Sequence, residues 1–528
     1  MRTQGLPLRP HQIFSLLLFA TYFVVGWLIV DDYGVTYDEA VQRRQGHVAV
    51  AYVADRLGID HPPLATEGRS FSEYGMMFQM IATVAEVKLG AMDDAFRFYQ
   101  IRHVLGYLLF GLALIFFYRT LRIRWPTQPW YPLLGTLLLV LTPRIFAHAF
   151  FNPKDHVLLV SYVIATYTLA RFLQRRTYGA LAWHILASAL ALNTRFPALT
   201  LVGGTVAILL WEQLFARPGN FRRLLHIALY LPATFLLMLP FFPYLWVDTG
   251  SRLTGAIAHM GSYTWDSTNL LFGDRLKATE LPFYYIPAWI LITTPIGYLV
   301  FMLTGLYRTV RQSLLGLRRL QLWQDFGSQL DFVQLGLSIG PIIVIIILHS
   351  TVYNGWRHLH FVYPGLVFLA ITGYDYARSK FARAVPLVLG LALTVTLINM
   401  VRMHPLQQVY FNYFIHGQLT ARFDMDYWGA GYREALVQLA EQIPEGQTVR
   451  VKCQNWPCVD NIRALPPAAR GKIVHESEWG KADYVATNFY WPQESVDVRN
   501  RSGIFAHPAV ELAPRGDLIV GIYHNRSD

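Results

Sequence analysis

Apolar runs close to the length of a membrane-spanning helix recur along the whole chain, separated by short polar segments. Examples are 13–30, 133–141 with its flanks, and 224–242. A helix needs about 20 apolar residues to cross the roughly 30 Å of hydrocarbon in a bilayer. The recurrence predicts about eleven transmembrane helices, so the expected fold class is a polytopic α-helical membrane protein.

The first and second apolar runs are separated by a long segment, 31–100, that is too polar to lie within lipid. It contains two amphipathic stretches, 76–89 and 96–101. Amphipathic helices of this kind lie in the plane of the membrane surface. We therefore expect interfacial helices in this first outer loop, whereas the loops at 148–156 and 193–197 are too short to leave the bundle.

The pattern changes after the last apolar run. A helical pattern at 432–442 ends at Pro444-Glu445-Gly446, and strand-like segments follow at 448–453, 484–489 and 518–524. Alternating helix and strand patterns are typical of a small α/β domain. The prediction is a membrane domain over 1–401 and a soluble α/β domain over 402–528.

The composition agrees with this pattern: 54% of the 528 residues are hydrophobic and 15% are charged, more apolar surface than one soluble core hides. The formal net charge of +11 is concentrated in alternate loops. The positive-inside rule then places the N-terminus in the cytoplasm and everything after about 401 outside, so nucleic-acid binding is not needed to explain the charge. The basic residues on the inner side are Arg119, Arg122, Arg124, Arg171, Arg175, Arg176, Arg217, Arg222, Arg223, Arg308, Arg311, Arg318, Arg319, Arg378, Lys380 and Arg383.

Both cysteines, Cys453 and Cys458, fall in the outer domain. An oxidising compartment favours a local disulfide between them. Two free thiols in a turn are the alternative, and their spacing alone does not decide between the two.

A pair of acids, Asp38 and Glu39, follows the first apolar run where the chain leaves lipid. A partly desolvated carboxylate has a raised pKa and accepts a proton from a bound hydroxyl more readily. The alternative is that these acids only mark the end of a helix, and spacing by itself favours that interpretation.

A second polar cluster, Asn152-Pro153-Lys154-Asp155-His156, lies in a loop so short that it must sit on the bundle. Such a cluster needs partners: Asp155 is a candidate to orient an acceptor or Lys154, and Lys154 to meet an anion. The alternative is a helix cap in which Lys154 neutralises Asp155. Local sequence supports both equally.

Arg195, Arg357 and His358 are exceptions to an outer side that is otherwise poor in positive charge. A phosphate at the outer interface matches guanidinium groups in geometry and charge. The alternatives are snorkelling or pairing with a nearby acid for Arg357, and an ordinary buried histidine for His358. No Cys/His set has the spacing of a zinc site, and we predict no structural metal.

These motifs together resemble the polyprenyl-phosphate-sugar-dependent glycosyltransferases of the GT-C superfamily, the group that contains protein O-mannosyltransferases and the bacterial aminoarabinose transferase of lipid A (family 39 type). The resemblance covers the whole membrane part. It rests on Asp38-Glu39, on the short loop Phe151 to Asp155 and on the order of the spans, and extends to the segments 354–360, 404–412 and 426–429.

The resemblance implies an inverting transfer, outside the cytoplasm, of a sugar from a polyprenyl-phosphate donor to an acceptor hydroxyl of a glycan, lipid or protein. It assigns the general base to Asp38, a supporting role to Glu39, and acceptor binding or orientation of the base to Asp155. Lys154, Arg195, Arg357 and, last, His358 are our candidates for the donor phosphate, chosen from charge and predicted side.

The resemblance also bears on cofactors and on location. Some branches use a divalent metal, for which Asp38, Glu39 and Asp155 are the ligands on offer. The charge of Lys154 beside Asp155 favours a metal-independent enzyme without cofactors. The expected location is a bacterial inner membrane, with the active site and the C-terminal domain in the periplasm.

Two other function classes fit a polytopic chain. A transporter or lipid flippase predicts inverted repeats, broken central helices and ionisable residues at mid-membrane depth. A non-catalytic assembly or receptor subunit predicts that Asp38 and Asp155 lie far apart.

Overall fold

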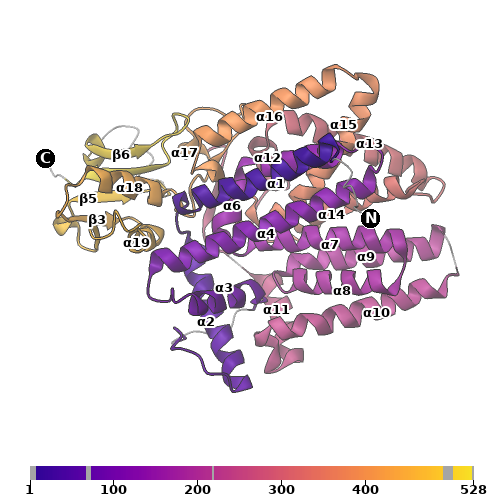
Figure 1. The fold of residues 1–528 in the computed structure, drawn as a ribbon, viewed down its shortest axis with the longest axis horizontal. Coiled ribbons are helices and arrows are strands. Elements are labelled where there is room, and N and C mark those ends of the chain that lie inside the picture. The colour runs from indigo at the N-terminus through magenta and orange to yellow at the C-terminus, as the bar shows by residue number, and fades with distance from the viewer. Residues whose placement is uncertain (1–7, 67–72, 217–218, 264, 491–502, 526–528) are drawn as a thin grey trace, which may run out of the picture.

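The computed structural model describes residues 8–66, 73–216, 219–263, 265–490 and 503–525. A long helical bundle carries a small sheet at one end, and the N-terminal end of α1 (Pro10–Ile29) lies at the other (Figure 1). Arg217, one of the basic residues counted above, lies outside the described residues.

Seven described helices are long and apolar enough to cross a membrane, and a bent pair makes an eighth. Six of the seven contain or are α1, α4 (Ala95–Arg124), α7 (Asp155–Arg175), α10 (Phe221–Met238), α14 (Phe326–Ile347) and α16 (Ala384–Arg402). The seventh is the span Phe196–Phe215, which consists of α9 (Leu199–Trp211) and the short helical segments on either side of it. The pair is α5 (Tyr131–Val140) and α6 (Pro143–Phe151), which meet at 66°.

Three further helices lie alongside these, namely α8 (Tyr178–Leu192), α13 (Ile296–Leu317) and α15 (Tyr363–Lys380). Counting the bent pair as one unit, these helices make eleven units in the described part of the bundle. A short helix, α12 (Tyr285–Thr293), leads into α13. The mostly helical membrane fold expected from the sequence is confirmed, although only seven or eight of these units satisfy the length and hydropathy of a span by themselves.

Helix α7 is the centre of the bundle. In the most apolar stretch of α7, 83% of the residues are buried. In the corresponding stretches of α1 and α10, 22% of the residues are buried. Because α1 and α10 turn most of their surface outward, they are the helices that meet lipid. Asp155 is the first residue of the central helix, so its position is fixed by the packing of the whole bundle.

The segment predicted as the first outer loop contains α2 (Tyr37–Leu57) and α3 (Met77–Lys88). The helix expected at 76–89 is therefore present, but the separate interfacial helix expected at 96–101 is not: that stretch is the first turn and a half of α4. Asp94 caps α4 by accepting hydrogen bonds from the backbone N–H groups of Phe96 and Arg97. A helix of 30 residues is about 45 Å long, so α4 is longer than the roughly 30 Å thickness of the hydrocarbon layer.

The large outer loop that follows α10 folds into α11 (Thr249–Ser262) and a hairpin, β1 (Thr268–Leu271) with β2 (Asp274–Lys277). Two short helical segments line the same end of the bundle, the 3₁₀ segment η6 (Arg357–Val362) and α17 (Leu419–Arg422).

The C-terminal part is an α/β unit with a five-stranded sheet in the order β4-β3-β5-β7-β6. Strand β3 runs parallel to β4 and β5, while β7 is antiparallel to β5 and β6. The strands are β3 (Val449–Cys453), β4 (Ile473–Glu476), β5 (Tyr484–Thr487), β6 (Pro508–Leu512) and β7 (Val520–His524), with α18 (Tyr432–Gln442) and α19 (Trp456–Arg463) as the helices.

The helix α18 and the strands β3, β5 and β7 lie where the pattern predicts them, whereas β4, β6 and α19 were not predicted. A disulfide joins Cys453 at the end of β3 to Cys458 in α19. Of the two possibilities that the spacing left open, the structure has the disulfide.

The α/β unit is attached to the segment that precedes α2. The side chain of Asn461 accepts a hydrogen bond from Val35 N (2.9 Å) and donates one to Val35 O (2.8 Å). Gly34 has no room for a side chain, because a Cβ there would lie 2.1 Å from the carbonyl oxygen of Ala430. The start of α2, and with it Asp38, is thus held between the bundle and the C-terminal unit.

Candidate active site

Asp38 and Asp155 lie together, although 117 positions of chain separate them. Nη1 of Arg357 donates to Oδ2 of Asp155 (2.8 Å) and lies 3.3 Å from Oδ2 of Asp38. Each acid is in the first turn of its helix, α2 or α7, where the helix dipole stabilises a carboxylate. Three segments that are far apart in the chain therefore meet at one guanidinium group.

A second guanidinium group reaches the same acid from the loop after α8. Arg195 forms an ion pair with Oδ1 of Asp155, so each oxygen of this buried carboxylate has its own arginine. The alternative in which Lys154 neutralises Asp155 is wrong, since the counter-ions are Arg195 and Arg357. Asn152 orders the loop by accepting from the backbone N–H of Asp155 (2.8 Å).

Lys154 turns away from Asp155 and lies against an aromatic ring. Its Nζ is 4.2 Å from the centre of the Tyr74 ring, and the guanidinium of Arg195 is 6.0 Å from the same ring. Burial, followed by the positive charge of Arg195, lowers the pKa of Lys154 to about 7, against the opposing influence of Asp38. A cation in this state is a ready partner for an anionic group.

Arg357 is enclosed by aromatic rings. Its guanidinium carbon lies 4.6 Å from the ring centre of Trp428 and 5.0 Å from that of Tyr353. Stacking of this kind stabilises a desolvated guanidinium and fixes its plane. Contacts with both rings therefore restrain the orientation of Arg357 beside the two carboxylates.

His358 is next to Arg357 in the chain but has a different environment. It is buried, with its ring 4.6 Å from that of Tyr353. Burial and the charges of Arg357, Arg195 and Lys154 lower its pKa well below its usual range. His358 is therefore neutral at physiological pH and offers a phosphate a hydrogen bond at most, without a charge.

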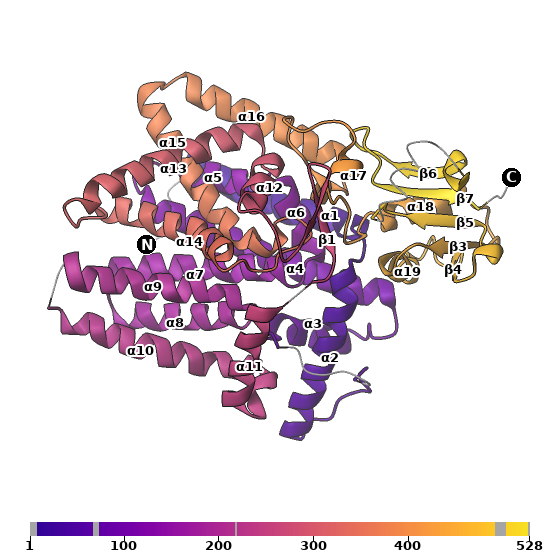
Figure 2. The ribbon, with the colours of Figure 1, turned by 180° about the vertical axis from the view of Figure 1, so that it is seen from behind.

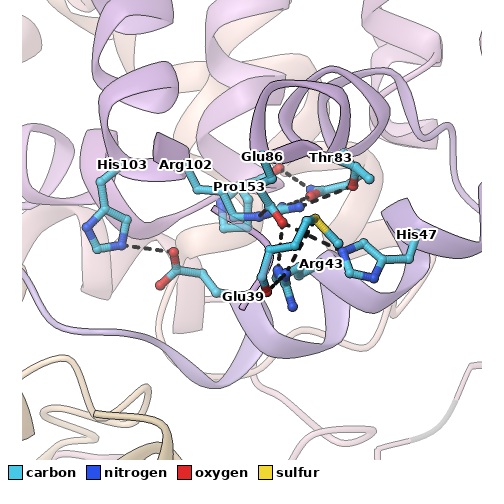
Figure 3. A network of polar contacts seen from close by, with 10 residues as sticks. Glu39, Arg43, His47, Thr83, Glu86, Arg102, His103 and Pro153 are labelled. Carbon is cyan, nitrogen blue, oxygen red and sulfur yellow. Dashed lines mark hydrogen bonds and ion pairs between the residues drawn. The ribbon is translucent and has the colours of Figure 1, made fainter. Parts of the chain in front are cut away.

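Glu39 points away from Asp38. One carboxylate oxygen lies 2.9 Å from Nε2 of His103 (Figure 3). The other accepts hydrogen bonds from the backbone N–H and the hydroxyl group of Thr36. The Thr36 hydroxyl also lies 3.1 Å from the carbonyl oxygen of Phe151, the last residue of α6. From this position Glu39 supports the site by joining α2 to α4 and, through Thr36, to the end of α6.

A buried charge network lies behind Glu39 (Figure 3). Glu86 of α3 accepts from Nε of Arg102 (2.5 Å) and from Nε of Arg43 (2.8 Å). Burial raises the pKa of Glu86, but the hydrogen bond from His47 and the charges of Arg102 and Arg43 outweigh it and lower the pKa to about 2.

The network reaches the loop that carries Lys154. Arg102 donates to the side chain of Gln79 (2.7 Å), whose amide in turn donates to the carbonyl oxygen of Pro153 (3.0 Å). A chain of hydrogen bonds thus runs from α4 through α3 to the residue that precedes Lys154. These residues position the candidate phosphate-binding lysine without contacting a substrate.

A metal site would need several acids or histidines turned toward one point. Within the described ranges no group of three His, Cys, Asp or Glu side chains is arranged to hold a metal ion. Asp38 and Asp155 face Arg357 and Arg195, while Glu39 faces His103. The expectation that the enzyme needs no metal stays a prediction.

Sequence analysis did not identify the aromatic residues Tyr74, Tyr353 and Trp428 or the charges of Glu86 and Arg102. Trp428 lies within one of the segments that carried the resemblance, but no role was assigned to it. For Glu86 a usable pattern exists: Gln79, Thr83 and Glu86 recur at helical spacing on the buried face of an amphipathic helix.

Comparison with known proteins places this arrangement in a wider context. No protein-family model matches the chain, and no curated protein matches it in sequence. Among solved structures, ArnT from Cupriavidus metallidurans bound to undecaprenyl phosphate matches 97% of this chain and 98% of its own, with 13% identity and a TM-score of 0.50. The chain has the GT-C fold.

A second GT-C match agrees with the first. The oligosaccharyltransferase of Archaeoglobus fulgidus in its apo form covers 91% of this chain with 69% of its own length, at 10% identity and a TM-score of 0.51. The ArnT match includes the C-terminal α/β unit, because nearly the full length of both chains is aligned. The GT-C fold predicted from the motifs is therefore confirmed, whereas identities this low leave the chemistry to be argued from the site.

Proposed function

We propose that the protein is an inverting glycosyltransferase that moves a sugar from a polyprenyl-phosphate donor to an acceptor hydroxyl at the outer face of the membrane. The observation that carries the proposal is the meeting of Asp38, Asp155 and Arg357 at one point, with Arg195 and Lys154 beside them. It combines a proton acceptor with positive charges, which are the two requirements of this transfer.

Asp38 is the better candidate for the base because an acceptor can reach it. Its side chain is 22% exposed, whereas that of Asp155 is 1% exposed and fully engaged by two arginines. Asp155 then acts by holding Arg357 and Arg195. In this division of roles Asp38 accepts the proton of the acceptor hydroxyl, and Asp155 fixes the positions of the two arginines.

Lys154, Arg195 and Arg357 form the candidate phosphate site. In the transfer, the acceptor oxygen bonds to the anomeric carbon as its proton passes to Asp38, and the bond from that carbon to the phosphate oxygen breaks with its electron pair. The released phosphate gains negative charge that nearby cations stabilise. Displacement from the face opposite the phosphate inverts the anomeric configuration.

The bound lipid of one similar structure supports a lipid-linked donor. ArnT from Cupriavidus metallidurans has been crystallised with undecaprenyl phosphate. A donor anchored in the bilayer brings its phosphate to the membrane boundary, and the candidate phosphate site lies just before the outer end of α7. The proposed location is a bacterial inner membrane, with the N-terminus in the cytoplasm and the site and the α/β domain (402–528) outside.

The acidic and basic groups of the site favour this function over a transporter or lipid flippase. They gather where α2 and α7 begin, at the end of the bundle next to the α/β unit, rather than midway along the helices. A non-catalytic subunit predicts a large separation of Asp38 and Asp155, and both lie within 3.3 Å of one nitrogen atom of Arg357.

The experiment is sugar release from a radiolabelled panel of polyprenyl-phosphate sugars by the purified protein, comparing wild type with Asp38→Asn. The exchange is nearly isosteric and removes the proton acceptor, so release by the variant should fall by a factor of about 10² to 10⁴. Equal release by both proteins would place the base elsewhere. If the wild type released sugar from no donor, the result would favour the transporter or lipid flippase function instead.

A further inference from the structure

A large cavity lies at the other end of the bundle, away from the candidate active site. Its volume is about 990 Å³, and it is formed by the ends of α7 and α9 and the beginnings of α10 and α14. Figure 2 shows these helix ends at the side of the molecule opposite the C-terminal sheet. Nothing in the proposed transfer uses this cavity.

The wall of the cavity contains an ordered charge cluster. Glu212, in the single π-helical turn that follows α9 (Glu212–Ala216), forms ion pairs with Arg176 and, at 3.4 Å, with Arg223. Gln329 of α14 donates to the same carboxylate (2.7 Å), and Arg223 also donates to the backbone carbonyl of Glu212 (2.9 Å). One buried carboxylate thus fixes two guanidinium groups from different helices.

The positive charge of the cavity exceeds its negative charge. Four arginines line it, whereas its carboxylates are Glu212 and Asp325, and Asp325 caps α14 by accepting from the N–H of Ser328. Among the described residues no carboxylate forms an ion pair with the remaining two arginines, Arg222 and Arg319. The four arginines are Arg176, Arg222, Arg223 and Arg319.

Large apolar side chains surround this charge. Phe215 lines the cavity and is exposed, as are its chain neighbour Leu214 and, next to Arg222, Phe221. Exposed apolar groups beside arginines are typical of the membrane boundary, where acyl chains meet headgroups. A soluble anion would contact only the arginines, whereas a lipid contacts the arginines with its headgroup and the apolar side chains with its acyl chains.

From this arrangement we propose that the cavity binds the phosphate headgroup of an anionic glycerophospholipid from the leaflet that faces the N-terminus. The headgroup contacts Arg222 and Arg319, the Glu212 cluster holds the wall in place, and the acyl chains lie against the apolar rim. Basic pockets between helices at the cytoplasmic side commonly recognise such headgroups. The proposal is independent of the transferase activity.

The test is lipid binding by the full-length protein, purified in detergent, freed of lipid and given equal amounts of phosphatidylglycerol and phosphatidylcholine. Bound lipid is counted by native mass spectrometry. Wild type should retain phosphatidylglycerol in preference, and Arg222→Gln/Arg319→Gln should reduce that retention by about tenfold or more. Arg222→Lys/Arg319→Lys keeps the charge and should retain most of the binding.

The matched control is Arg311→Gln/Arg383→Gln, which removes two exposed basic residues outside the cavity. It should bind as wild type does, and an equal loss in this control would overturn the proposal. Equal retention of both lipids by wild type would also overturn it. Displacement of the lipid by millimolar glycerol 3-phosphate would show a soluble phosphate site instead of a lipid site.

Discussion

Nη1 of Arg357 donates to Oδ2 of Asp155 over 2.8 Å, and this buried contact joins residues 202 positions apart in the chain. The same nitrogen lies 3.3 Å from Asp38, so the carboxylate that we assign as the base is held next to the carboxylate that anchors the site. A contact that connects three distant segments of the chain should affect both catalysis and folding, and different variants measure the two effects separately.

Replacing Arg357 should affect the chemical step. Arg357→Gln removes the charge between the two acids, and we expect kcat for sugar transfer to fall by a factor of about 10² to 10³. Arg357→Lys keeps the charge but loses the planar fork that contacts Tyr353 and Trp428, and should recover only part of the rate. Steady-state transfer kinetics measure both variants, and a wild-type kcat in Arg357→Gln would contradict the assignment.

Asp155→Asn should be more destabilising than Asp38→Asn. Removing the buried carboxylate leaves Arg195 and Arg357 without their common counter-ion, a loss of about 3 to 5 kcal/mol in the free energy of unfolding. Asp38 is partly exposed, and its replacement should cost less than about 1 kcal/mol. Thermal unfolding in detergent compares the two variants, and equal shifts in Tm would show that Asp155 is not the anchor.

Binding of the donor should depend on pH through Lys154. Because its pKa is about 7, the ammonium form is present below pH 7 and is lost as the pH rises through that value. We expect the KM for the donor to rise between pH 6 and pH 9 in wild type. In Lys154→Arg it should stay nearly constant, since a guanidinium keeps its charge over this range.

The matching loss-of-charge variant is Lys154→Met. It should weaken donor binding by about tenfold at pH 6 and very little at pH 9, where the wild-type lysine is itself neutral. If Lys154→Met weakened binding equally at both values of pH, the charge of Lys154 would not be the cause.

The Glu86 network should be a major contributor to stability. Glu86→Gln leaves the buried Arg102 and the partly buried Arg43 without their carboxylate, and we expect a loss of about 3 to 5 kcal/mol. The exposed Glu441 of α18 provides a control, since Glu441→Gln should change stability by less than about 0.5 kcal/mol. Denaturation in detergent followed by circular dichroism measures both.

The pH dependence of Glu86 has a definite sign. Its pKa in the folded protein, about 2, is below the usual value near 4.5, so the stabilisation is present above that usual value and is lost as the pH falls toward 2. Wild type should therefore lose stability over this acid range. Glu86→Gln should lose less, and an identical acid profile in both would exclude Glu86 as the group responsible.

Most of the architecture follows from periodicity, because lipid-facing helices and alternating strands leave strong patterns in the sequence. The apolar runs 13–30, 133–141 and 224–242 fall on helices, and the strands β3, β5 and β7 lie in the predicted segments. The error at 96–101 arose because an amphipathic stretch continues without a break into an apolar run. No local pattern separates an interfacial helix from the outer turns of a long one.

The site was predicted in its members but not in its contacts. Asp38, Asp155, Arg195 and Arg357 do come together, yet Lys154 faces Tyr74 instead of its neighbour Asp155. Neighbouring residues at the start of a helix point in directions about 100° apart, so adjacency in sequence does not imply pairing. Which arginine meets which acid depends on tertiary packing, which a single sequence does not encode in any local pattern.

The two hydrogen bonds between Asn461 and Val35 bear on how deletion variants should be interpreted. A protein shortened after α16 loses Asn461 and therefore this clamp, the two hydrogen bonds to the backbone of Val35, three residues before Asp38. It also loses Trp428, whose carbonyl oxygen accepts a hydrogen bond from the N–H of Tyr37. Inactivity of such a truncation would not show that the C-terminal unit recognises the acceptor. Only point substitutions on its outward surface, made with this clamp intact, separate recognition from support.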